Sequence, residues 1–78
     1  MSVFYFKNNA LSIDNQFIEE KNIHSMTLTN MTLNDSITFG ISSGNSKLLD
    51  IDSSYYRQPG VYKAEINEEV FYFKIDGI

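Results

Sequence analysis

The segment VFYFK occurs twice in this chain, at Val3–Lys7 and again at Val70–Lys74. Alternate side chains of an extended strand point to opposite faces, so each copy puts its phenylalanines on one face and its tyrosine on the other. The sequence therefore predicts a strongly apolar strand near each end, and these two strands lie as neighbours or face each other across a core. We attribute the repeat to convergence on good strand chemistry rather than to internal duplication, because the flanking residues do not repeat.

The first copy begins a predicted β-hairpin. Asn8-Asn9 follows it, and this pair tolerates positive φ and suits a tight two-residue turn. Folding the chain back about this turn pairs Phe6 with Leu11. Further along the same hairpin, Phe4 is paired with Ile13. The four apolar side chains then share one face, as a half-buried hairpin requires.

The second copy ends a similar hairpin. A Pro-Gly break precedes Val61–Ile66, in which apolar and charged side chains alternate. A turn near Asn67-Glu68 then places Tyr62 opposite Phe73. The apolar side chains again fall on one face, so both copies of the repeat are expected to be the aromatic strand of a half-buried hairpin.

Further strands are predicted in the middle of the chain, where apolar side chains alternate with Thr, Ser and charged residues. Their ranges are Met26–Thr29, Ser36–Ser42 and Lys47–Ile51. In the second of these ranges, alternation directs three apolar side chains inward, namely Ile37, Phe39 and Ile41. Met31 and Leu33 continue the first alternation out of phase, which indicates a bulge or bend near Asn30.

Helix signals are weak. Asp14–Asn22 has a short helical spacing with Asp14 in the capping position, and it predicts at most one helical turn or a short strand. The polar stretch Asp52–Gly60 is expected to be a loop. Residues 1–78 are thus predicted to form a single all-β domain, an antiparallel β-sandwich or a small barrel with about six or seven strands.

Composition excludes several classes of function. Six basic residues are scattered among ten acidic ones and the net charge is −4, so we expect no direct binding to nucleic acid. No apolar run is long enough to cross a bilayer, and we expect no membrane association. The N-terminus lacks the pattern of a signal peptide, and the absence of cysteine fits a reducing compartment such as the cytoplasm.

No catalytic or metal-binding pattern is present in the sequence. His24 is the only histidine, and with no cysteine it cannot complete a typical metal site. Asp50-x-Asp52 resembles the beginning of a calcium loop, but the further oxygen ligands and the closing Glu do not follow. The four glycines are isolated, so they form no phosphate-binding loop. We therefore expect a protein that is not an enzyme and that uses no cofactor or metal.

The segment from Asp52 to Ile66 resembles the end of many immunoglobulin-like domains. In such domains a polar loop crosses between the sheets and precedes Gly-x-Tyr-x-Ala, a pattern that Gly60, Tyr62 and Ala64 reproduce. The resemblance implies that the tyrosine hydroxyl bonds back to the backbone of the loop. It covers roughly the second half of the chain, and the Cys pair and Trp of antibody domains are missing. Similar small sandwich domains occur in bacteriophage tail and baseplate proteins, so the fold class implied is an immunoglobulin-like β-sandwich.

Two groups of aromatic residues are candidate protein-binding sites. Tyr55, Tyr56 and Arg57 lie together in the predicted loop, and Tyr and Arg are enriched at binding hot spots. The alternative is that one tyrosine packs under the sandwich as a lid while the other lies flat on the surface with the arginine. Tyr5 and Tyr72 are the outward residues of the repeated strands and form the second candidate patch.

These observations favour a non-enzymatic module that binds a protein partner or forms a homo-oligomer. Together with the resemblance, they predict a structural or accessory component of a larger assembly such as a phage virion or tail, located in the host cytoplasm or in the virion. The alternative is a small acidic inhibitor, of anti-defence or anti-CRISPR type, that blocks a nucleic-acid-binding enzyme. Salt dependence separates the two, because an acidic mimic binds through long-range attraction that salt screens.

Overall fold

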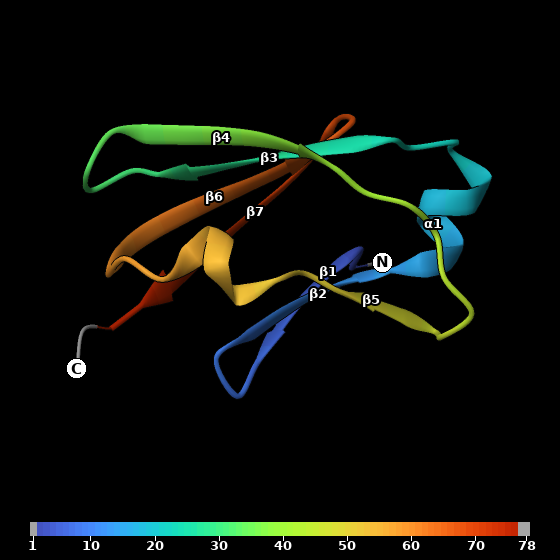
Figure 1. Ribbon diagram of the computed structural model, residues 1–78, viewed down its shortest axis with the longest axis horizontal. Helices are drawn as coiled ribbons and strands as arrows, with labels where there is room; N and C mark the ends of the chain where they lie inside the picture. Colours follow the sequence, from blue (N-terminus) through green and yellow to red (C-terminus); the bar gives the residue numbers. More distant parts are fainter. Residues whose placement is uncertain (1, 77–78) are drawn as a thin grey trace.

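Two antiparallel sheets lie face to face in the computed structural model, which describes residues 2–76 (Figure 1). The first sheet has the strand order β1 (Phe4–Lys7), β2 (Ala10–Asp14), β5 (Leu48–Asp50). The second sheet has the order β4 (Asp35–Gly40), β3 (Ser25–Asn30), β6 (Gly60–Ile66), β7 (Glu69–Ile75). The prediction of an all-β domain with about six or seven strands is confirmed, and of the two predicted architectures the structure is the sandwich, because the two sheets do not close into a barrel.

The strand order determines which edges of the sandwich stay open. In immunoglobulin-like constant domains the first, second, fifth and fourth strands form one sheet and the third, sixth and seventh form the other. This chain has the same neighbours except that β4 pairs with β3 instead of β5. One sheet therefore has four strands and the other has three, and β4 and β5 are edge strands on the same side of the sandwich.

The repeated VFYFK segments face each other across the core. β1 and β7 are edge strands of different sheets, and equivalent phenylalanines of the two copies stack. The ring centroids of Phe4 and Phe71 are 5.7 Å apart, and those of Phe6 and Phe73 are 4.7 Å apart. The repeat thus supplies matching aromatic rings from the two layers. Of the two predicted arrangements, the one in which the strands face each other is confirmed.

Asparagine turns set the register of the N-terminal hairpin, β1–β2, and of the C-terminal hairpin, β6–β7. Asn8 and Asn9 have φ of 54° and 60°, and the turn pairs Phe6 with Leu11 as predicted. Asn67 has φ of 56°, and the C-terminal hairpin pairs Tyr62 with Phe73. Positive φ is favourable for asparagine relative to most residues, so these turns fix which side chains reach the core.

Of the bulge or bend predicted near Asn30, the structure shows the bend and no bulge. β3 ends at Asn30, whose side-chain oxygen accepts hydrogen bonds from the backbone N–H groups of Thr32 and Leu33, each at 3.0 Å. The chain therefore reverses in a tight turn, and Met31 and Leu33 are exposed. β4 and β5 are slightly shorter than predicted, since they end at Gly40 and Asp50, whereas β3 is longer and extends from Ser25 to Asn30.

Two short helices connect the strands. α1 (Asn15–Glu20) lies at one end of the sandwich between β2 and β3, where Asp14 caps it as predicted and Ile18 is buried. The 3₁₀-helix η1 (Ser53–Tyr56) follows β5 and occupies part of the segment predicted to be a loop. The core between the sheets is formed by Phe4, Leu11, Ile13, Ile18, Met26, Leu28, Ile51, Tyr56, Tyr62, Ala64, Ile66 and Phe73.

Tyr56 anchors η1 to the three-stranded sheet. Its buried hydroxyl accepts a hydrogen bond from Leu11 N–H at 3.0 Å and donates one to the Ile51 carbonyl at 3.1 Å. Because Ile51 N–H already donates to the Leu11 carbonyl, the hydroxyl stands where the second backbone bond of this residue pair would form. The tyrosine thereby satisfies two backbone groups at the point where the chain leaves the sheet.

Substitution Tyr56→Phe is expected to lower the free energy of unfolding by about 2 kcal/mol, because a buried N–H and a buried C=O both lose their partner. The control is Tyr5→Phe, since the exposed Tyr5 hydroxyl donates to the Ser2 carbonyl and water can replace that acceptor. We expect this control to change stability by less than about 0.5 kcal/mol. Urea denaturation followed by circular dichroism measures both, and equal effects would contradict the anchoring role.

Candidate functional site

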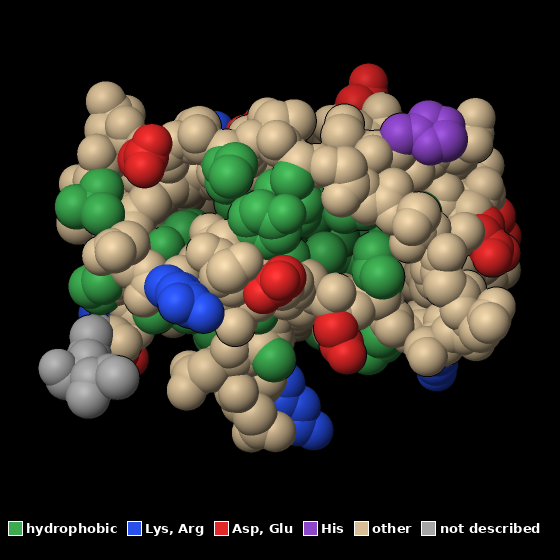
Figure 2. All heavy atoms as spheres, in the orientation of Figure 1, with side chains coloured by type: hydrophobic (Ala, Val, Ile, Leu, Met, Phe, Trp, Pro, Cys, Tyr) green, Lys and Arg blue, Asp and Glu red, His purple; other side chains and the backbone are tan. Residues whose placement is uncertain are grey.

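An apolar surface is exposed where β4 extends beyond the three-stranded sheet. Ile37 lies on the inner face of β4, opposite Leu28 of β3, yet 44% of it is exposed. Leu33, in the turn before β4, is 56% exposed. Figure 2 shows hydrophobic side chains gathered between the two layers on this side of the molecule. Ile37 points inward as predicted, but the three-stranded sheet does not cover it.

A groove follows this open edge between β4 on one side and β5 with η1 on the other. It consists of two hollows with volumes of about 290 Å³ and 390 Å³, and both are lined by Tyr55. The first hollow lies over Leu28, Leu33, Ile37 and Tyr62. The second lies over Phe39, Ile41, Leu49 and Ile51. Each hollow of the groove therefore contains a cluster of apolar side chains, although the first is also lined by polar residues such as Asn30 and Gln58. Apolar clusters bordered by polar groups are typical of the centre of a protein interface.

Tyr55 joins the two sides of the groove. Its ring stacks on Phe39 of β4, with centroids 3.8 Å apart and ring planes 3° from parallel. The tyrosine comes from η1, and Asp52 fixes the start of that helix by accepting a hydrogen bond from Ser54 N–H at 3.0 Å. The stack therefore bridges the sheets at the open edge and places a half-buried aromatic ring in the middle of the groove.

One end of the groove is held by Asn30 and Gly60. Besides ordering the turn after β3, Asn30 donates from its side-chain nitrogen to the Pro59 carbonyl at 3.1 Å. Gly60 has φ of 136°, and a Cβ at this position would come within 2.7 Å of the Asn30 side-chain oxygen. Glycine is therefore required for the close approach of these two segments. This contact positions the turn that carries Leu33 against the loop that carries Arg57.

Acidic side chains outnumber basic ones among the residues that line the groove. Asp35 and Arg57 are at the first hollow, and Asp50 and Asp52 are at the second. Hydrogen bonds from the backbone and side chain of Ser54 hold the pKa of the Asp52 carboxyl below its ordinary value, so this group is negative at neutral pH. Acidic side chains border the hydrophobic patch in Figure 2. The rim of the groove therefore carries net negative charge.

The structure brings together only part of the predicted site. Tyr55 and Arg57 both line the first hollow of the groove. Tyr56 is buried, so the packing of one loop tyrosine beneath the sandwich is observed. Tyr5 and Tyr72 are 40% and 60% exposed, but they point away from the stacked phenylalanines of their strands. They lie on the outer faces of different sheets and do not form one surface.

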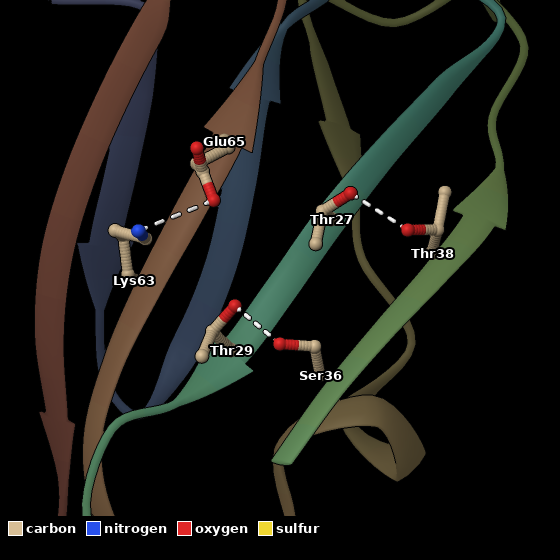
Figure 3. A network of polar contacts seen from close by, with 6 residues as sticks. All are labelled: Thr27, Thr29, Ser36, Thr38, Lys63 and Glu65. Atoms are coloured by element: carbon tan, nitrogen blue, oxygen red, sulfur yellow. Dashed lines mark hydrogen bonds and ion pairs between the residues drawn. The ribbon is translucent and has the colours of Figure 1, made fainter. Parts of the chain in front are cut away.

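On the outer face of the four-stranded sheet, β3 and β4 carry polar side chains that contact one another (Figure 3), whereas β6 and β7 also expose Val61, Val70 and Tyr72. Thr27 and Thr38 share a hydrogen bond of 2.8 Å between β3 and β4, and Thr29 and Ser36 share one of 2.9 Å. Further along this face, Lys63 pairs with Glu65 at 3.5 Å. The exposed apolar residues of this face each stand opposite a charged one, Val61 opposite Lys74, Val70 opposite Glu65 and Tyr72 opposite Lys63. The apolar side chains at the open edge are neighbours of one another, so the groove is the better candidate for an interface.

Other sites considered from the sequence have structural explanations. His24 is exposed, and its backbone carbonyl accepts a hydrogen bond from Ile41 N–H at 2.9 Å. Asp52 caps η1. Within residues 2–76, no three His, Cys, Asp or Glu side chains gather as a metal site requires. No helix in the same range is long and apolar enough to span a bilayer.

Sequence reasoning missed three residues of the groove, Leu33, Ile37 and Phe39, as part of a site. Alternation correctly marked two of them as inward-facing, and inward-facing apolar residues are normally assigned to a core. The missing information was the strand order, because only the pairing of β4 with β3 leaves this inner face uncovered.

Comparisons with protein-family models, with curated proteins and with solved structures found no match to this chain.

Substitution Tyr55→Leu is expected to lower the free energy of unfolding by about 1 kcal/mol, because the ring stack with Phe39 is lost. Tyr72→Leu is the matched control, since Tyr72 is 60% exposed and stacks on no ring among the described residues. We expect the control to stay within about 0.5 kcal/mol of the unmodified protein. Thermal denaturation of the two variants measures the difference, and an unchanged Tyr55→Leu variant would show that the stack contributes nothing.

Proposed function

We propose that this chain is a non-enzymatic protein-binding module that acts as a structural or accessory component of a larger assembly, such as a phage virion or tail. The observation that carries this proposal is the uncovered apolar groove between β4 and β5. Exposed apolar surface costs free energy in water, and a contiguous patch rimmed by polar groups is typical of a protein interface. The partner covers the inner face of β4, which the chain itself leaves open.

The shape of the groove supports a macromolecular partner. The two hollows form a strip along the strand edge, and the one buried polar side chain that lines them, Asn30, is already bonded to Pro59, Thr32 and Leu33. Small-molecule sites instead need a few convergent polar groups that orient the ligand. Tyr55 and Arg57 are residue types that often contribute most of the binding energy at protein interfaces. Both lie where a covering partner would contact them.

Two features support the resemblance on which the assembly role rests. The Tyr62 hydroxyl donates to the Gln58 carbonyl at 2.8 Å, which is the contact expected of a tyrosine corner. The strand order differs from that of an immunoglobulin-like domain only in the position of β4. Small sandwiches of this kind serve as building blocks in phage tails, and a module that exposes one apolar edge suits such a role.

The acidic-inhibitor alternative has less support from the distribution of charge. A mimic of nucleic acid needs a dense row of carboxylates on one face. Here the acidic residues are divided between α1 with its cap, the groove, the outer face of β6, the turn between β6 and β7, and the segment after β7. An interface based on the groove is expected to persist in about 1 M salt, where the Debye length is only about 3 Å. A polyanion mimic is expected to release its partner under the same conditions.

Substitution Ile37→Ser is expected to weaken partner binding by about tenfold or more, because it places a polar group in the centre of an apolar interface. The matched control is Val70→Ser, which makes the same kind of change at a 50% exposed position of β7. Affinity capture from the native source, followed by quantitative mass spectrometry, measures the recovery of each companion protein. A stoichiometric companion that is kept by the control and lost by Ile37→Ser supports the proposal.

Two outcomes contradict this function. The first is a chain that stays monomeric at high concentration and recovers no stoichiometric companion. The second is a companion that is lost equally with Val70→Ser and Ile37→Ser, because binding would then not depend on the groove. Light scattering after size-exclusion chromatography gives the oligomeric state, and it also separates a homo-oligomer from a complex with another protein.

A further inference from the structure

The β4 strand has an open backbone edge beside the groove. Within residues 2–76, β4 pairs with β3 on one side and with no strand on the other. Ile41 N–H donates to the His24 carbonyl, so alternate residues from this point direct their backbone groups toward β3. Ser36, Thr38 and Gly40 therefore direct their N–H and C=O groups away from the sheet. These groups are available to a further strand.

The same edge presents its side chains in two ordered rows. Ile37 and Phe39 lie on the inner face and line the groove. Ser36 and Thr38 lie on the polar outer face, where their hydroxyls bond to β3. A strand added to β4 would direct every second side chain into the groove and the others to the polar face. The site thus requires a segment in which apolar and polar residues alternate.

The charges around the groove favour a basic segment. Asp35, Asp50 and Asp52 line it together with one basic residue, Arg57. A second copy of this chain has the wrong sign, because the net charge of the protein is −4. Complementary charge increases the rate of encounter and disfavours partners of like charge. The occupant is therefore expected to belong to a different protein and to carry Lys or Arg among its polar residues.

We propose that the groove binds an extended, basic segment of another protein, which pairs with the free edge of β4 as a fifth strand of the four-stranded sheet and inserts alternate apolar side chains between the sheets. This inference rests on the proposed protein-binding function and specifies the chemistry of the partner. Edge pairing supplies main-chain hydrogen bonds, and the hollows on either side of Tyr55 supply side-chain selectivity. The opposite edge offers no such site, because stacked phenylalanines fill the space between β1 and β7.

The test uses the full chain and short synthetic peptides of alternating valine and lysine, or valine and glutamate, in a nuclear magnetic resonance titration. The lysine peptide is expected to shift the backbone amides of Ser36, Thr38 and Gly40 and the ring signals of Tyr55. Those amides are also expected to exchange more slowly with solvent when the peptide is bound. At low salt the glutamate peptide is expected to bind at least about fivefold more weakly.

Variants at the two free edges of this sheet provide the matched comparison. Thr38→Pro removes a backbone N–H donor that points away from β3, so it is expected to weaken binding of the lysine peptide by about tenfold or more. Thr38→Val removes only the hydroxyl bonded to Thr27, and the affinity of this variant for the lysine peptide is expected to stay within about twofold of the wild-type value. Tyr72→Pro makes the equivalent edge change in β7 and is expected to have equally little effect. The wild-type exchange data decide the question even if a proline variant does not fold.

Several results would overturn the inference. One is that the largest chemical-shift changes lie on β7 instead of β4, and another is that the glutamate peptide binds as tightly as the lysine peptide. A third is that the amide signals of β4 change with protein concentration when no peptide is present, because a second copy of the chain would then be the occupant. A native partner that is lost by Ile37→Ser but kept by Thr38→Pro would also overturn it while leaving the protein-binding function intact. Failure to capture any Ile37-dependent partner would instead remove the function on which the inference rests.

Discussion

The ring-on-ring contact between β1 and β7 is the constraint on which the rest of the sandwich depends. Phe4 stacks on Phe71 and Phe6 stacks on Phe73, so the two sheets are joined at one edge by matching side chains of the repeated segment. A chain of 78 residues without cysteine must obtain its stability from a single core, and large rings bury much area per residue. The repeat of VFYFK is therefore explained by the need for equivalent rings from both layers.

Tyrosines connect this stack to the rest of the sandwich, since Tyr56 and Tyr62 both pack on Phe73. Tyr56 and Tyr62 are buried, and their hydroxyls bond to the backbone around η1, while Tyr55 reaches across to Phe39. Because β4 belongs to the four-stranded sheet, the edge of β5 has no neighbour among the described residues and the inner face of β4 stays partly uncovered. The molecule is thus closed by aromatic stacking on one side and bridged by a single stack on the other. This asymmetry leaves apolar side chains of the inner face of β4 exposed at one edge of the sandwich.

Local rules predicted the hairpins well, because register in a hairpin follows from the turn and from alternation. Asn8-Asn9 fixed the pairing of Phe6 with Leu11, and the C-terminal turn fixed the pairing of Tyr62 with Phe73. The site was less predictable, since it depends on which strands become neighbours across long sequence separations. Alternation identified Ile37 as inward-facing, but only the place of β4 in the strand order makes that inner face accessible.

A single spectrum tests the central claim that one edge of the sandwich is closed by the repeated strands and the other is bridged by one aromatic stack. Nuclear Overhauser contacts can be recorded between Phe and Tyr rings in an otherwise deuterated chain. The account predicts ring contacts between Phe4 and Phe71 and between Phe6 and Phe73, and at the opposite edge the contact between Phe39 and Tyr55. Absence of the contacts between the repeated strands, or their pairing in another register, would contradict it.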